Sequence, residues 1–154
     1  MARLKKYETL KKIGENEIVA IVRVDDTEKA EKCFDALKEG GINVIEMTFT
    51  IPYAHTMFER LSKKYGESVI IGAGTVLDSE TARIAMLSGA KFIVSPSFNE
   101  GVAKICNRYA VPYFCGVNLT TIKEWINSGV FACGVGGELV NGYRQLNLQS
   151  RQVV

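Results

Sequence analysis

Ile18-Val19-Ala20-Ile21-Val22 is an unbroken apolar run that ends at Arg23. Runs of this kind, rich in β-branched residues, are typical of a strand that is covered on both faces, as strands are in parallel sheets. The residues before it predict a helix over positions 3–13, ended by Gly14. The apolar residues of this helix recur at intervals of three: Leu4, Tyr7, Leu10 and Ile13. Together the two elements begin an alternation of helix and strand that continues along the chain.

Strands of similar composition are predicted to begin near residues 18, 44, 70, 92, 111 and 130. A helix is expected after each of the first five. Asp26, Pro52 and Asp78 are suited to begin three of these helices, and glycines such as Gly40 and Gly89 to end them. This alternation predicts an α/β fold with a parallel sheet and helical crossovers. We expect a single domain over residues 1–154.

The composition excludes several classes of protein. A net charge of +2 gives no argument for binding nucleic acid or an acidic membrane surface, and no window of eighteen apolar residues predicts a transmembrane helix. The N-terminus lacks the pattern of a signal peptide, so we expect a cytoplasmic protein. None of the cysteines forms a C-x-x-C pair, which favours reduced thiols over disulfides or a zinc site. They are Cys33, Cys106, Cys115 and Cys133.

The carboxyl ends of the predicted strands carry the candidate functional residues, because ligands collect at that end of parallel sheets. Glu46 lies between Ile45 and Met47 on a strand, so its side chain points to the opposite face. A carboxylate on a buried strand is unfavourable unless it is paired or acts as an acid or base. From spacing alone, two interpretations stay open: a catalytic group, or an ion pair with Arg23. The single histidine, His55, is predicted to lie on a helix surface.

Two glycine-rich segments follow predicted strands. Gly72-Ala73-Gly74-Thr75 lets a backbone approach a ligand while Thr75 supplies a hydroxyl. Gly134-Val135-Gly136-Gly137 precedes a possible helical turn, where backbone N–H groups can hold a phosphate. Neither segment decides the function by itself, because glycine-rich turns are common and the second lacks the dinucleotide-binding pattern.

In order and spacing, these segments resemble the family of 2-keto-3-deoxy-6-phosphogluconate and 4-hydroxy-2-oxoglutarate aldolases. The resemblance extends over nearly the whole chain to about Gly142. The segments that carry it are Ile18–Arg23, Gly40–Thr50, Ile70–Val76, Phe92–Pro96, Val111–Tyr113 and Val117–Gly137.

The resemblance implies a TIM-type (β/α) barrel of eight strands, a homotrimer, and cleavage of a keto-acid or phosphosugar substrate without metal or cofactor. The products would be pyruvate and either glyceraldehyde 3-phosphate or glyoxylate, and the pathway the Entner–Doudoroff pathway. Glu46 would be the acid/base beside a lysine that forms a Schiff base with pyruvate. Arg23, Thr75 and Pro96 would line the pyruvyl pocket, and Gly136 and Gly137 the phosphate site.

The sequence departs from the family after the fifth strand. Only six strands are recognisable, and the sixth and seventh βα units are missing at a join near residues 116–117. The Lys-Leu-Phe-Pro-like segment with the Schiff-base lysine is absent with them. Lys91 begins a strand and Lys123 lies on a predicted helix, so neither replaces it. Lys63, Lys64 and Lys104 are predicted on outer helical faces.

Without the lysine, the 154 residues are expected to be inactive as a class I aldolase. The gap is either a true deletion, which leaves an incomplete barrel, or an internal stretch missing from the sequence. Three functions are therefore compared: an aldolase, a catalytically inactive barrel remnant that binds a keto-acid or phosphate ligand, and another phosphate-binding barrel enzyme such as a sugar-phosphate epimerase. The third predicts metal-ligating histidines or paired aspartates at strand ends, which the sequence does not supply.

Overall fold

The computed structural model describes residues 2–16 and 18–116, and these form a curved parallel sheet with helices outside it. Within this part, five strands pair in chain order. They are β1 (Ala20–Val22), β2 (Val44–Thr48), β3 (Ile70–Gly74), β4 (Phe92–Ser95) and β5 (Tyr113–Cys115). The helices are α1 (Ala2–Asn16), α2 (Thr27–Glu39), α3 (Ala54–Tyr65), α4 (Ser79–Leu87) and α5 (Glu100–Tyr109).

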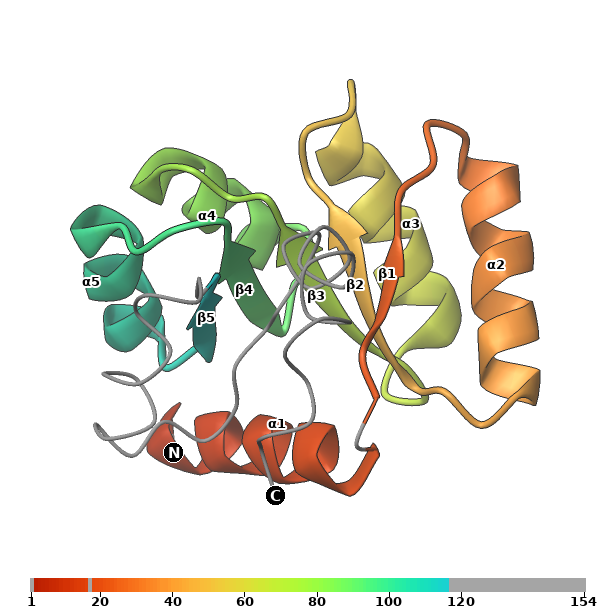
Figure 1. Cartoon of the computed structure of the whole chain (residues 1–154), viewed down its shortest axis with the longest axis horizontal. Helices are drawn as coiled ribbons and strands as arrows, with labels where there is room; N and C mark the ends of the chain where they lie inside the picture. The colour runs from red at the N-terminus through yellow and green to blue at the C-terminus, as the bar shows by residue number, and fades with distance from the viewer. Residues whose placement is uncertain (1, 17, 117–154) are drawn as a thin grey trace, which may run out of the picture.

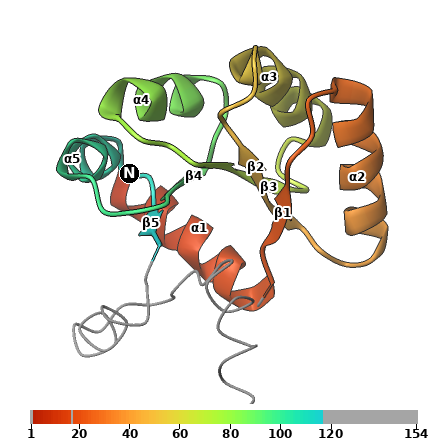
Figure 2. The same ribbon diagram turned by 45° about the horizontal axis from the view of Figure 1, so that its top comes forward.

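Helices α2 to α5 cover the outer face of the sheet, whereas α1 crosses the end where the strands begin (Figures 1 and 2). Parallel pairing of strands that follow one another in sequence, with a helix in every connection, is the arrangement that the alternation predicted. The predicted strand near residue 130 and the helix before it lie outside the described residues. Among the helices that are described, none is both long and apolar enough to cross a membrane.

Side-chain caps fix the starts of three outer helices. The carboxylates of Asp26 and Asp78 accept hydrogen bonds from the backbone N–H groups of residues 29 and 81, at 2.8 and 2.6 Å. Asn99 caps α5 in the same way at 3.0 Å. The caps predicted at Asp26 and Asp78 are thus confirmed, and each satisfies a donor that the first helical turn leaves unpaired.

Several predicted boundaries are wrong. Helix α1 continues through Gly14 to Asn16, whose side-chain amide donates to the Lys12 carbonyl at 2.8 Å. Helix α3 begins at Ala54 and not at Pro52, because Tyr53 has a left-handed backbone (φ 58°) that places the proline in the preceding turn. Strands β1 and β5 each begin two residues later than predicted, where pairing with the neighbouring strand starts.

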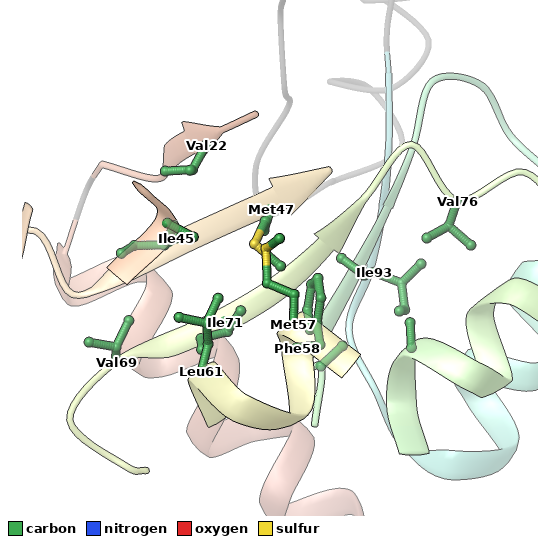
Figure 3. Close-up of a cluster of buried hydrophobic side chains, with 14 of the residues drawn as sticks. Val22, Ile45, Met47, Met57, Phe58, Leu61, Val69, Ile71, Val76 and Ile93 are labelled. Atoms are coloured by element: carbon green, nitrogen blue, oxygen red, sulfur yellow. The ribbon is translucent and has the colours of Figure 1, made fainter. Parts of the chain in front are cut away.

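The sheet buries apolar side chains on both faces. On the outer face, alternate strand residues such as Ile45, Met47 and Ile71 pack against the helices, with Phe58 and Leu61 of α3 among their partners (Figure 3). The inner face forms a second, smaller cluster that α1 closes at one end. It consists of Ile13, Val44, Ile70 and Phe92, with Val94 and Phe114 packed against them. Burial on both faces is why the strands lack a simple apolar–polar alternation.

Gly72 makes the packing of the inner face possible. It pairs with Phe92 on the next strand, and a Cβ atom at residue 72 would overlap the Phe92 ring. That ring is almost fully buried and meets Phe114 edge-to-face, with the ring centroids 5.8 Å apart. The ring therefore has little freedom to move away from an added methyl group.

Gly72→Ala is expected to destabilise the fold by about 1–3 kcal/mol, because it overpacks the inner face against Phe92. Shortening the ring in Gly72→Ala/Phe92→Leu should recover part of the loss, whereas Phe92→Leu alone should destabilise. Urea denaturation measures all three. Gly40→Ala is the matched control, since a Cβ there meets only backbone oxygens at ordinary contact distances of 3.4 and 3.5 Å. A Gly72→Ala variant as stable as this control would contradict the packing described.

Candidate active site

Four of the residues predicted to form a site lie on neighbouring strands or directly after them. Arg23 directly follows β1, Glu46 lies within β2, Thr75 follows β3 and Pro96 follows β4. The two remaining residues, Gly136 and Gly137, lie outside the described residues. His55 is exposed on α3, as expected for a surface residue.

Glu46 occupies the inner face of the sheet. Its register partners are Ile21 on β1 and Gly72 on β3, and it is partly buried. Removal from water raises the pKa of its carboxyl above the usual value, and the positive charge of Arg23 offsets part of this rise. Burial thus makes the carboxylate a stronger base than an exposed glutamate.

The Glu46 carboxyl group lies over the backbone of Gly74. A Cβ atom at residue 74 would overlap the carboxyl group, so the space that it occupies depends on the absence of a side chain there. The φ angle of Gly74 is not in the left-handed region. The glycine is therefore required for close approach and not for backbone conformation.

Arg23 is held by a hydrogen bond to a neighbouring strand. Its Nε donates to the Oγ1 atom of Thr48 at 3.3 Å, and Thr48 is only 2% exposed. Among the described residues, no ion pair within 4.0 Å joins Arg23 to Glu46, so the simple pairing considered from the sequence is not formed. The exposed guanidinium has five N–H donors, and Thr48 takes one of them. The others can bind an anion such as a carboxylate.

Thr75 has an unusual backbone. Its φ angle is +59°, a left-handed conformation that β-branched residues rarely adopt and that often marks a functional segment. The next residue, Val76, is fixed on both sides: its N–H donates to the Val94 carbonyl at 3.0 Å, and its carbonyl accepts from the Ser95 hydroxyl at 2.5 Å. Both contacts are with β4, which therefore holds the backbone directly after Thr75 in place.

Pro96 is exposed at the end of β4. Within the described part of the chain, neither Pro96 nor Thr75 is hydrogen-bonded to Glu46 or Arg23. The structure therefore brings Arg23, Glu46, Thr48 and Gly74 into one cluster, and places Thr75 and Pro96 beside it on the next strand ends.

Comparison with known proteins agrees with this arrangement. The sequence model of the family described as "Aldolase: KDPG and KHG aldolase" matches residues 9–130, which is most of the chain. The chain belongs to this aldolase family. The resemblance inferred from the sequence is thus confirmed, and the epimerase alternative gains no support.

Two individual relatives are also aldolases. The 2-dehydro-3-deoxy-phosphogluconate aldolase of Treponema pallidum (strain Nichols) is 33% identical over 125 residues, covering 80% of this chain and 58% of the relative. The Haemophilus influenzae protein of the same name is 33% identical over 109 residues, covering 71% and 51%. The chain thus spans little more than half the length of these curated relatives.

A solved structure supports the fold. The 4-hydroxy-2-oxoglutarate aldolase/2-deydro-3-deoxyphosphogluconate aldolase from TTHB1 superposes with a TM-score of 0.71 at 26% identity, covering 92% of this chain and 70% of that one. The predicted TIM-type α/β fold is confirmed. The extent of the domain over residues 1–154 and the missing units near residue 116 stay predictions.

Two residues of the cluster were not predicted as site residues. Thr48 is two positions after Glu46, so the strand period places both on one face, and this spacing was the available signal. Gly74 belongs to the segment of residues 72–75, which was considered because its backbone can approach a ligand. Its role beside Glu46 follows from the pairing of Thr48 with Gly74, which the sequence does not reveal.

None of the five described strands carries a lysine. Lys91 lies just before β4, at the opposite end from Glu46, and Lys63, Lys64 and Lys104 are on outer helices, as predicted. Lys64 is part of an exposed network with Glu31 and Asp35 of α2. Lys123 lies outside the described residues. The described cluster therefore supplies a base and a guanidinium, but no amine nucleophile.

Glu46→Gln is expected to stabilise the protein at pH 7, by less than about 1 kcal/mol because water screens the partly exposed group. The pKa of Glu46 is raised on folding, so the folded state favours the protonated carboxyl, and ionisation lowers stability as the pH rises. Well below the unfolded pKa of about 4.3, where the carboxyl is protonated in both states, the difference should vanish. Urea denaturation from pH 3 to 8 measures this difference in the free energy of unfolding between the variant and the original protein. Glu59→Gln, at an exposed position of α3, is the control, and equal profiles for the two variants would contradict the burial of Glu46.

Gly74→Ala should displace the Glu46 carboxyl group and cost about 1 kcal/mol of stability. The same change in a Glu46→Ala background should cost almost nothing, because the overlapping atoms are gone and alanine suits a strand better than glycine. The four proteins form a double-mutant cycle, measured by urea denaturation. Additive effects would show that the two residues do not share this space.

Proposed function

We propose that the protein is an aldolase that cleaves 2-keto-3-deoxy-6-phosphogluconate or 4-hydroxy-2-oxoglutarate to pyruvate and an aldehyde. Family membership supports the reaction class, and the names of the relatives support the substrates. The observation that carries the proposal is the Glu46 carboxyl group, partly buried on the inner face over Gly74 and beside a guanidinium. A basic carboxylate near an anion-binding group suits chemistry next to the carboxylate of a keto acid.

In the proposed mechanism, Arg23 binds the pyruvyl carboxylate, and the bond to Thr48 fixes the direction of its guanidinium. Thr75 and Pro96 line the pocket from the next strand ends. Glu46 moves protons at the carbinolamine and at the carbon next to the imine. Its raised pKa brings it closer to neutrality, where a group can both accept and donate a proton.

Cleavage of the carbon–carbon bond needs an amine in addition. A primary amine converts the keto group into an imine, which accepts the electron pair of the broken bond. The five described strands carry no lysine. We place the amine in the βα units that the sequence lacks between residues 116 and 117, and Gly136 and Gly137 at the phosphate group of the substrate. Assembly as a homotrimer and a cytoplasmic location rest on the resemblance alone.

Intact-mass spectrometry of the purified protein, before and after pyruvate and borohydride, tests this proposal. We expect one reduced pyruvyl adduct per chain, on a chain heavier than 17.0 kDa that contains the missing units. Peptide mapping should place the adduct on a lysine from those units, and a Lys91→Gln variant should still be labelled. A chain of 17.0 kDa without an adduct would overturn the proposal and leave a barrel remnant that binds its ligand without covalent chemistry.

A further inference from the structure

The left-handed backbone of Thr75 is held from the two neighbouring strands. On one side, the carbonyl of Gly74 accepts a hydrogen bond from the N–H of Phe49, the residue after β2, at 2.8 Å. On the other side, Val76 is bonded to β4 through its N–H, which donates to a backbone carbonyl, and through its own carbonyl, which accepts from the Ser95 hydroxyl. A β-branched residue with a φ angle of +59° persists only where its surroundings fix the backbone, and these contacts do so.

Of these hydrogen bonds, only the one from Ser95 involves a side chain. Ser95 is 2% exposed, and its Oγ lies 2.5 Å from the Val76 carbonyl oxygen. The strand period places Ser95 on the outer face of β4 with Ile93, in the apolar core to which Val76 also belongs (Figure 3). Val76 is fully buried, so water does not reach its carbonyl. A hydroxyl group in this apolar core is favourable because it satisfies that carbonyl.

We propose that Ser95 is a positioning residue of the aldolase site. Its hydroxyl fixes the backbone after Thr75 and so keeps the Thr75 side chain at the pyruvyl part of the substrate. Without the hydroxyl, the Val76 carbonyl is buried without a partner, and a backbone rearrangement that turns it toward water becomes favourable. Thr75 then leaves the left-handed region in most molecules, and only the remaining fraction binds the substrate fully. The inference rests on the proposed function, because Thr75 lines the pyruvyl pocket only in that proposal.

The Ser95→Ala variant of the full chain tests this role by the kinetics of cleavage of 2-keto-3-deoxy-6-phosphogluconate and 4-hydroxy-2-oxoglutarate. We expect KM to rise about tenfold, because the binding-competent conformer falls to about a tenth of the population. The value of kcat should change by less than about twofold, because bound substrate selects that conformer. The variant should fold, since the Ser95 carbonyl still accepts from the Gly116 N–H at 2.8 Å and the register with β5 is kept.

Ser88→Ala is the matched control. Ser88 is also a buried serine whose hydroxyl donates to a backbone carbonyl, that of Ile84 at 3.0 Å, but it lies at the end of α4, before β4 begins. Its loss should lower stability in a similar way and leave KM unchanged. In an active protein, equal KM values for Ser95→Ala and Ser88→Ala would overturn the positioning role.

A second background tests whether Ser95 acts through Thr75. Thr75→Gly removes the side chain and adopts the left-handed conformation without strain. In this background, Ser95→Ala should raise KM by less than about twofold, because no side chain is left to position. A further tenfold rise would show that Ser95 acts by another route, and the proposal would be wrong.

NMR distinguishes a failure of this inference from a failure of the proposed function. The Cα and Cβ chemical shifts of residue 75 report its backbone conformation. We expect them to move toward extended values in Ser95→Ala and to stay unchanged in Ser88→Ala. If the original protein cleaves neither substrate, the proposed function fails and the role of Ser95 fails with it. If the original protein is active and the shifts of residue 75 do not move in Ser95→Ala, only the Ser95 inference is wrong.

Discussion

The placement of one carboxylate on the inner face of a curved parallel sheet constrains much of this structure. Glu46 is on β2 between two residues that pack outward, so the strand period directs it inward. Room for it exists because β3 has glycines at positions 72 and 74. One of them admits the Phe92 ring and the other the carboxyl group. Residues 72–74 of β3 thus leave space both for the inner core and for the candidate site.

The two ends of the inner face have different physical character. At the amino end, α1 covers the face through Ile13 and gives an apolar cluster, which contributes to stability in the usual way. At the carboxyl end lie a carboxyl with a raised pKa and a threonine in a left-handed conformation. Both are unfavourable for folding and are maintained by the outer core. Such features are expected where a protein uses its stability to hold reactive groups.

The sequence predicts the parallel alternation because short apolar runs recur along it, and β1, β3 and β4 each lie between a glycine and a side-chain helix cap. It also predicts Glu46 and Arg23, since charged residues on or directly after buried strands stand out. The helix boundaries predicted at Gly14 and Pro52 were wrong because neighbouring residues set them. The side chain of Asn16 bonds to the last turn of α1 and extends that helix, and the left-handed backbone of Tyr53 makes α3 begin after Pro52. The contacts of Thr48 and Gly74 depend on register between strands, which is a property of the folded sheet.

Uncovered apolar surface lies on the same face of the sheet as Glu46. Ile21 is the register partner of Glu46 and faces the interior, yet its side chain is 65% exposed, because β1 is an edge strand of the described sheet. In a closed barrel, further strands join the last strand to the first and cover such residues. The family resemblance assigns the Schiff-base lysine to one of those strands. The strands that would cover Ile21 would therefore also bring an amine to the face that carries Glu46, so closure of the barrel and completion of the active site are one structural requirement.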